Sequence, residues 1–336
     1  MRLQNRNTGE SRDFTLRQAR PEDASQIIAC IRGAYGNTYV KPFLYTEEGV
    51  RHCDATGEMR FSVAEDDGGQ IAGVTAYELD AGFPGMAEIA CQVIAREYNG
   101  YGLALPLALH AMERAEKLPL TGQFARALGC HLISQKTLKG MGFTASGFLL
   151  NVFDKELFRH HYQNGDYAKI PQTLAVKRQG EWAAPPLWLP EELIGLAQGM
   201  FEELGVPLRL CSGGEKAGPG RWERSEDARH ATVTLWARAC GDDFEDRLIQ
   251  ETAFPSAQPG RTVNLYLNLS SPGAAAAYQT ARDRGFFFTG LLPCVSDGTY
   301  MILHNPLEIP VLLDGIPYIP EYAPFVEQIR RQLCQR

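Results

Sequence analysis

Two glycines lie where a strand gives way to a helix, in the stretch CQVIAREYNGYGLALPL, residues 91 to 107. Glycines at such a junction let backbone N–H groups converge without interference from a Cβ atom. The start of a helix also has unsatisfied donors and a positive dipole, so the junction around Gly100 and Gly102 could bind a pyrophosphate without any lysine or arginine. A tight turn followed by close helix packing is the alternative interpretation of these glycines.

Composition narrows the class of protein. The chain has 336 residues, which favours two domains, and a formal net charge of -7, which argues against a general nucleic-acid binder. The first residues are polar, unlike a signal peptide, and no run approaches the about 20 apolar residues that cross a bilayer. The eight cysteines are scattered, without a CxxC pair or a His/Cys cluster. We therefore expect a cytoplasmic protein with reduced thiols that binds no metal, no nucleic acid and no membrane.

The pattern of apolar residues predicts an α+β fold. The expected order is a strand, two helices, three strands, a helix, a strand, a short helix and a strand, ending near residue 153. A DDGG turn joins two of the strands, which is a hairpin signal. This order indicates a mostly antiparallel sheet with one strand-helix-strand crossover.

A change of composition at RQGEWAAPPLWLP, residues 178–190, suggests a boundary between domains 1–178 and 179–336. The two halves share an internal echo, because SQKTLKGMGFTASGFLL in the first resembles AAYQTARDRGFFFTGLL in the second. Each segment reads as a helix, then Gly-Phe, then a strand that ends in glycine and leucines, Gly-Phe-Leu-Leu in the first and Gly-Leu-Leu in the second. The echo predicts two related domains in tandem.

The glycine-bearing stretch resembles the acyl-CoA motif Q/RxxGxG/A of the GNAT superfamily of N-acyltransferases, with Asn99, Gly102 and Ala104 at its three fixed positions. The segments LRQARPEDASQI, GQIAGVTAYEL, AEIACQVI and HLISQKTLKGMGFTASGFLL resemble successive parts of the same fold, in the expected order, over residues 13 to about 155. The resemblance implies a GNAT fold, which is a mixed, mostly antiparallel sheet flanked by helices. It also implies acetyl-CoA as cosubstrate.

The resemblance implies roles for two groups of residues. The strand before the loop would splay from its neighbour and pair with pantetheine, and a backbone N–H near its end would face the thioester oxygen. The loop would hold the pyrophosphate. Carried over, the strand residues are Gln92, Val93 and Ile94, and the loop residues are Asn99, Gly100, Tyr101, Gly102, Leu103 and Ala104.

Two positions depart from the family pattern. Asn99 replaces a Gln or Arg, so the loop keeps a hydrogen-bonding side chain without a charge. Leu138 stands where a Tyr often protonates the leaving thiolate, four residues before the Gly-Phe. The second departure leaves no aligned general acid and puts activity in doubt.

Acylation of an amine needs the neutral amine, so a base is helpful at neutral pH. Glu88, on the expected fourth strand, is the first candidate, and a salt-bridged strand residue is its alternative interpretation. His131 is the second candidate, since its pKa would suit proton transfer, but it could also cap the next helix.

Four further residues have a functional and a structural interpretation. Ser134 could bind substrate or could begin a helix. Cys91 could carry an acyl group or could be a small buried hydrophobe. Tyr35 and Tyr39 follow the first helix, where family members often wall the acceptor site, and could equally pack in the core.

The second half looks like a degenerate GNAT domain. At the junction equivalent to the loop, it carries Asp242, Asp243 and Glu245, which would repel a pyrophosphate. We therefore expect that the second half binds no CoA. It could wall the acceptor cleft or pair two copies into a homodimer.

The sequence as a whole predicts an N-acetyltransferase that moves an acetyl group from acetyl-CoA directly to a primary amine of a small molecule or peptide. A non-catalytic acyl-CoA-binding regulatory protein is the alternative. An interaction scaffold is a third class that fits the second half alone.

Overall fold

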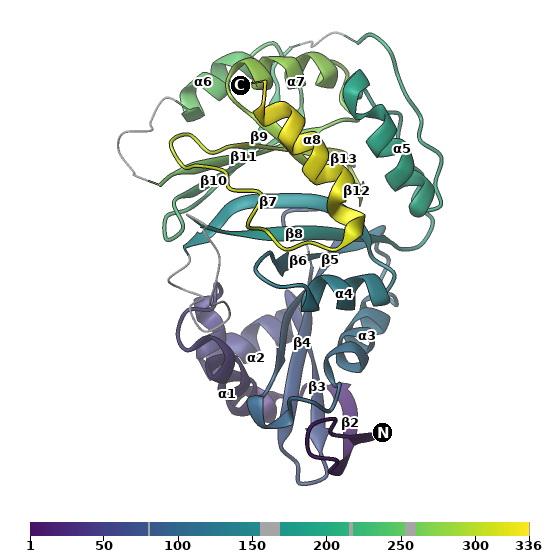
Figure 1. Ribbon diagram of the computed structural model, residues 1–336, viewed down its shortest axis with the longest axis vertical. Helices are drawn as coiled ribbons and strands as arrows, with labels where there is room; N and C mark the ends of the chain where they lie inside the picture. Colours follow the sequence, from purple (N-terminus) through teal and green to yellow (C-terminus); the bar gives the residue numbers. More distant parts are fainter. Residues whose placement is uncertain (80, 155–168, 215–217, 253–259, 336) are drawn as a thin grey trace.

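In the computed structural model, residues 1–79, 81–154, 169–214, 218–252 and 260–335 are described. Their strands form one sheet in the order β1-β2-β3-β4-β5-β6-β8-β7-β12-β13-β11-β10-β9, mixed and mostly antiparallel (Figure 1). Helices flank the sheet, so the expected α+β class is confirmed. None of the helices described is both long enough and apolar enough to cross a membrane.

The first half holds eight of these strands: β1 (Arg2–Gln4), β2 (Ser11–Gln18), β3 (Met59–Asp66), β4 (Ile71–Leu79), β5 (Met86–Ile94), β6 (Gly122–Leu128), β7 (Thr144–Asp154) and β8 (Lys169–Arg178). Its helices are α1 (Ala24–Tyr35), α2 (Glu47–Thr56), α3 (Ala104–Ala115) and α4 (Ile133–Gly140). Helices α1 and α2 lie on one face of this part of the sheet, and α3 and α4 lie on the other (Figure 1).

The second half adds β9 (Arg221–Asp227), β10 (Thr232–Ala239), β11 (Thr262–Asn268), β12 (Phe287–Val295) and β13 (Gly298–Asn305). Its helices are α5 (Ile194–Glu203), α6 (Phe244–Thr252), α7 (Ala274–Asp283) and α8 (Ala323–Leu333).

Local sequence signals account for several of these elements. Thr46 caps α2, since its side chain accepts a hydrogen bond from the N–H of Gly49. Gly57 ends the same helix with a left-handed φ of 81°. In the predicted hairpin turn, the Asp66 carboxylate accepts from the backbone N–H groups of Gly68 and Gln70.

The order of elements in the first half is repeated in the second. The series β5-α3-β6-α4-β7-β8 has the neighbour order β5-β6-β8-β7, and β10-α6-β11-α7-β12-β13 has the order β10-β11-β13-β12. The echo in the sequence therefore corresponds to equivalent elements, namely α4 with β7 and α7 with β12.

The two halves meet at equivalent residues of this repeat. Gly147 on β7 pairs with Gly290 on β12, and each lies five residues after the Gly of the Gly-Phe pair in its half of the sequence echo. Four residues beyond each glycine, a residue with positive φ lies in a β-bulge: Asn151 at 51° and Cys294 at 68°. Because equivalent residues face each other, a local two-fold axis passes through this seam.

The largest hydrophobic core also crosses the seam. It joins Phe83, Phe124 and Phe148 of the first half to the strands and helices of the second, including α8, where Phe325 stacks on Phe288. The boundary predicted at residue 178 is the last residue of β8. The division into two domains stays a prediction, because the halves share both a sheet and a core.

Candidate active site

An opening in the sheet begins where β5 and β6 separate. The two parallel strands pair only from Met86–Glu88 to Gly122–Phe124, although β5 runs on to Ile94 and β6 to Leu128. The equivalent strands β10 and β11 stay paired along Thr232–Ala237 and Thr262–Leu267. The splayed strand that the resemblance implies is therefore present in the first half and closed in the second.

A β-bulge bends β5 at the opening. The pairing with β4 shifts between Val74 and Ala76, and Cys91 takes a left-handed φ of 53° there. For a residue other than glycine such a conformation costs on the order of 1–3 kcal/mol, and strain of this kind often marks a functional site. Burial raises the pKa of the Cys91 thiol to about 12, so the thiol is a small buried hydrophobe and a poor nucleophile.

The loop that follows β5 exposes backbone donors on one side. Gly100 and Gly102 have φ of 98° and 76°, and α3 starts directly afterwards. On the other side, the carbonyls of Asn99 and Gly100 accept from the side chain of Asn5 at 3.0 Å and the N–H of Arg6 at 3.1 Å. The loop is thus anchored through its carbonyls. The N–H groups of Asn99 and Tyr101 donate to the carbonyls of Arg96 and Tyr98 at 3.2 and 3.4 Å, so within the described residues those of Gly100, Gly102 and the first turn of α3 are left for a ligand.

The loop offers its backbone and the exposed Asn99 for binding, because its larger side chains are turned inward. Tyr101 and Leu103 are buried, and Tyr101 packs edge-on against Phe14 at 5.3 Å. A Cβ atom added at Gly102 would meet nothing within 4 Å, so the space beside this residue is open. Gln92 holds the start of α3, because its Nε2 donates to the carbonyl of Ala104 at 2.7 Å.

A cavity of about 1300 Å³ occupies the opening. Most of the predicted site residues line it: Tyr35, Tyr39, Glu88, Cys91, Gln92, Val93, Ile94, Asn99, His131, Ser134 and Leu138. The other loop residues, Gly100 to Ala104, are not among its lining residues and follow Asn99 along the chain.

Glu88 is buried and forms a bidentate ion pair with Arg126 on β6. Its two carboxylate oxygens accept from Nε at 2.9 Å and from a terminal nitrogen at 2.5 Å. Burial opposes the charge of Arg126, but the ion pair with Glu88 outweighs it and leaves the pKa of Arg126 raised. Glu88 therefore has the salt-bridged character of its alternative interpretation, and the ion pair with Arg126 opposes its protonation as a base.

The segment around α4 brings a histidine and a serine to the cavity, but it has leucine where the tyrosine proton donor was expected. His131 and Ser134 line the cavity and are both half-buried. The carbonyl of His131 accepts from the side chain of Gln135 at 3.2 Å. Leu138 is buried in an apolar cluster with Phe143, so the position where a Tyr was expected offers no proton.

The equivalent junction in the second half is filled by its own chain. Asp243 accepts from the N–H of Gly220 at 2.7 Å, and Asp242 accepts from the N–H of Gly218 at 3.0 Å. A Cβ atom at Gly241 would lie 2.0 Å from the nitrogen of Gly220. These acids hold a loop against the start of α6, where a pyrophosphate would otherwise lie.

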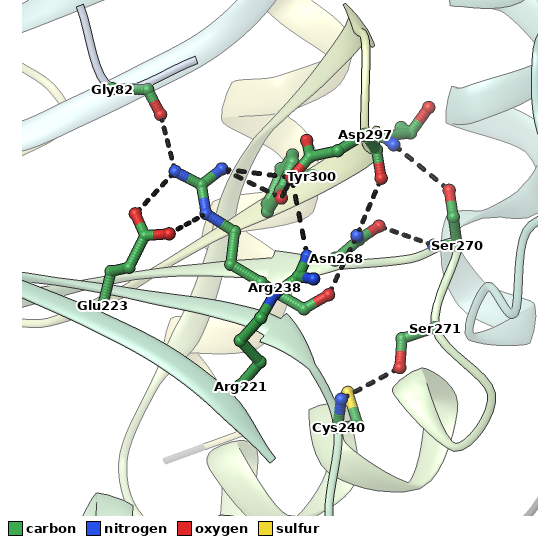
Figure 2. A network of polar contacts seen from close by, with 11 residues as sticks. Gly82, Arg221, Glu223, Arg238, Cys240, Asn268, Ser270, Ser271, Asp297 and Tyr300 are labelled. Carbon is green, nitrogen blue, oxygen red and sulfur yellow. Dashed lines mark hydrogen bonds and ion pairs between the residues drawn. The ribbon is translucent and has the colours of Figure 1, made fainter. Parts of the chain in front are cut away.

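A polar network ties the same region to the first half (Figure 2). Arg238, at the bulge of β10, donates to the hydroxyl of Tyr300 and to the carbonyl of Gly82, each at 3.0 Å. It also forms an ion pair with Glu223 at 2.8 Å. Because Gly82 belongs to the first half and also lines the cavity, this network fixes one edge of the cavity to the second half.

The sequence analysis missed the partner of Glu88 and the far wall of the cavity. That wall comes from β9, β10 and β11 of the second half, through Ser225, Asp227, His230, Thr232, Thr234, Trp236, Asn264 and Tyr266. One signal was present: Thr232, Thr234 and Trp236 alternate along β10 and share one face of the sheet. Polar residues at alternate positions of an otherwise apolar strand are typical of a wall that faces water or a ligand.

The chain is similar to several acetyltransferases whose structures have been solved. No protein-family model and no curated protein matches this chain. A GNAT superfamily phosphinothricin acetyltransferase from Sinorhizobium meliloti, solved in complex with AcCoA, is 20% identical with a TM-score of 0.42, over 50% of this chain and 89% of its own. An N-acetyltransferase from Staphylococcus aureus is 17% identical with a TM-score of 0.41, over 49% of this chain and 98% of its own. A ribosomal-protein-alanine N-acetyltransferase from Brucella melitensis is 19% identical with a TM-score of 0.40, over 49% of this chain and 99% of its own.

Proposed function

We propose that the chain is an acetyl-CoA-dependent N-acetyltransferase of the GNAT type, with its chemistry in the first half. The observation that carries this proposal is the opening between β5 and β6, which holds the cavity and begins at a strained bulge. Its features agree with what the sequence resemblance implies for acyl-CoA. A primary amine is the acceptor.

In this proposal the chain's own backbone binds the cosubstrate. Pantetheine pairs with the free edge of β5 at Gln92, Val93 and Ile94, and the pyrophosphate lies on the loop Asn99 to Ala104. The amine nitrogen attacks the thioester carbonyl and loses a proton to a base, for which Glu88 is the first candidate. The carbon–sulfur bond breaks, and the CoA thiolate leaves and takes up a proton from water. A backbone N–H near Ile94 stabilises the negative charge that develops on the carbonyl oxygen.

A non-catalytic acyl-CoA-binding regulator is the second candidate. Two observations favour it: Leu138 replaces the expected proton donor, and both oxygens of Glu88 are bound by Arg126. An assay of CoA release from acetyl-CoA with mixed primary amines separates the two functions. Release that depends on an amine supports the enzyme, whereas tight binding of acetyl-CoA without release supports the regulator.

We expect one molecule of CoA to bind per chain. The first half offers an opening and a donor-rich loop, but in the second half β10 and β11 stay paired and Asp242 and Asp243 occupy the junction. Isothermal titration calorimetry with CoA measures the stoichiometry. A value of two would contradict the closed second site, and no binding at all would contradict the proposed function.

The substitution Glu88→Gln tests whether Glu88 is the base. Loss of a general base typically lowers turnover about 100-fold to 10,000-fold. The same change removes the partner of Arg126, whose side chain is 31% exposed, so we also expect a loss of about 1–3 kcal/mol in the free energy of unfolding. Steady-state kinetics and urea unfolding measure the two effects, and CoA affinity should be nearly unchanged.

A double substitution separates these effects. In Glu88→Gln with Arg126→Gln, two amides face each other and no charge is left unpaired, so stability should recover. Turnover should stay low if Glu88 is the base. If turnover recovers with stability, Glu88 acts only through its ion pair, and His131→Ala then becomes the test of the second candidate. Full turnover in both Glu88→Gln and His131→Ala would assign proton removal to solvent or to the substrate.

A further inference from the structure

The second half places a buried histidine on the wall of the cavity. His230 is 2% exposed and lines the cavity, with its ring 5.0 Å from that of Phe153 and nearly perpendicular to it. Within the described residues, neither ring nitrogen of His230 has a hydrogen-bond partner. Leaving a buried polar group unsatisfied is costly, so this arrangement is suited to a ligand that completes it.

Charged groups around His230 favour a basic ligand. Asp227 and Arg229 approach from its own loop, Asp154 from β7 and Lys169 from β8. Of these four, Asp227 lines the cavity. The ammonium group of Lys169 donates to the backbone carbonyl of His230, and Lys169 pairs with Asp154 where β7 and β8 lie side by side. A ligand in the cavity therefore meets the carboxylate of Asp227 and not the two cations.

The imidazole is also in the right state to accept a hydrogen bond. Burial lowers the pKa of His230, so the neutral ring offers one acceptor nitrogen near pH 7. Asp227 uses one oxygen to accept from the backbone N–H of His230 at 3.1 Å, which places the carboxylate beside the ring. The hydroxyl of Thr232 and the ring of Phe153 complete this part of the wall, which we call the amine lobe: Phe153, Asp227, His230 and Thr232.

The amine lobe lies far from the place where the acetyl group would react. The N–H near Ile94 that would face the thioester oxygen lies on β5, whereas Phe153 lies on β7, and β6 and β8 stand between these two strands in the sheet. Neighbouring strands lie about 4.8 Å apart, so three such steps separate β5 from β7 by about 14 Å. One amine nitrogen cannot attack the thioester and contact His230 at the same time.

We propose that the amine lobe binds a second basic group of the acceptor, so that the acceptor is an elongated molecule with two basic nitrogens about 10 Å apart. This inference rests on the proposed function. The first nitrogen reaches the thioester in the opening. The second donates to the imidazole of His230 and forms an ion pair with Asp227.

Four primary amines of equal length test the proposal: octane-1,8-diamine, octylamine, 8-aminooctan-1-ol and 8-aminooctanoate. They differ only in the group at the far end, which is basic, apolar, neutral polar or acidic. We expect the diamine to be acetylated with a kcat/KM about 10-fold to 100-fold above that of octylamine, since a hydrogen bond to a charged group has this effect on affinity. The aminooctanoate should be the poorest substrate.

Two variants link this preference to the amine lobe. His230→Gln and Asp227→Asn should each reduce the advantage of the diamine about 10-fold and leave the kcat/KM of octylamine unchanged. His52→Gln, at an exposed residue of α2, is the matched control and should change neither value. Asp227 is exposed, so its variant keeps the test valid if replacement of the buried histidine impairs folding.

The outcomes separate this inference from the proposed function. If the diamine and octylamine react equally well, or if aminooctanoate or aminooctanol reacts best, the lobe does not bind a basic group. The same conclusion follows if His230→Gln and Asp227→Asn lower the kcat/KM values of the diamine and of octylamine by equal factors. If no amine is acetylated, the binding of octane-1,8-diamine to the CoA complex, measured by calorimetry, still tests the amine lobe. Binding that Asp227→Asn weakens supports the inference. Absent binding, or binding that Asp227→Asn leaves unchanged, overturns it.

Discussion

Replacing Gly102 with glutamate should abolish CoA binding, with a loss of at least about 100-fold in affinity. The new carboxylate would enter the space that the pyrophosphate needs, and it would repel the ligand at short range. A Cβ atom at Gly102 meets no neighbour within 4 Å, so the apo protein can accommodate the side chain. The φ of 76° adds a modest strain that does not depend on the ligand. Calorimetry with CoA measures the effect.

Gly142→Glu is the matched control. Gly142 follows α4, has a similar φ of 79° and also has open space around a Cβ atom. It therefore carries the same strain and the same added charge away from the loop, and CoA affinity should be close to that of the wild type. Unchanged affinity in Gly102→Glu would show that the loop is not the pyrophosphate site. Equal losses in both variants would point to a general effect of charge.

Gly147→Ala should destabilise the whole chain, because it acts at the seam between the halves. The added Cβ would lie 2.4 Å from the Cα of Gly290 and 2.4 Å from the carbonyl oxygen of Thr289. Both contacts are with backbone, which cannot swing aside as a side chain can, and the φ of 133° is itself unfavourable for alanine. We expect a loss of about 3 kcal/mol or more in the free energy of unfolding, measured by urea denaturation.

Gly195→Ala provides the comparison for this substitution. Gly195 is an exposed residue of α5 with open space around a Cβ atom, so alanine should stabilise the helix by up to about 1 kcal/mol. If the free energy of unfolding of Gly147→Ala also lay within about 1 kcal/mol of the wild-type value, the close pairing of β7 and β12 would not hold the halves together.

Features that depend on near neighbours in the chain were predictable. The cap at Thr46, the turn at Asp66 and the glycines of the loop each follow from conformational preferences of a few consecutive residues. The echo around Gly147 and Gly290 was also visible, since it compares two short segments. These features correctly indicated the α+β class.

Strands β8 and β9 were not predicted from the sequence, nor was the short β1, and the reasons for β8 and β9 are opposite. β8 lies between β6 and β7 in the middle of the sheet and is buried on both faces, so it lacks the alternation of a half-exposed strand. It also contains Pro171, which argues against a central strand. The proline is tolerated because the register of β7 skips from Leu149 to Phe153 at this point. β9 is an exposed edge strand of mostly charged residues, so it has no apolar pattern at all.

The amino-acid sequence alone is enough to specify the conformation of the loop, because positive φ at Gly100 and Gly102 and a helix start after them need only adjacent residues. Tertiary structure alone decided what surrounds that loop. Glu88 meets Arg126 only because β5 and β6 begin side by side, and His230 and Asp227 reach the cavity only because the second half packs against the first. The same holds for the closed second site, where β10 and β11 remain paired and Asp243 binds a loop 23 residues earlier in the chain. Such contacts depend on which strands become neighbours, and that choice is made by burial of a shared core and not by any local pattern.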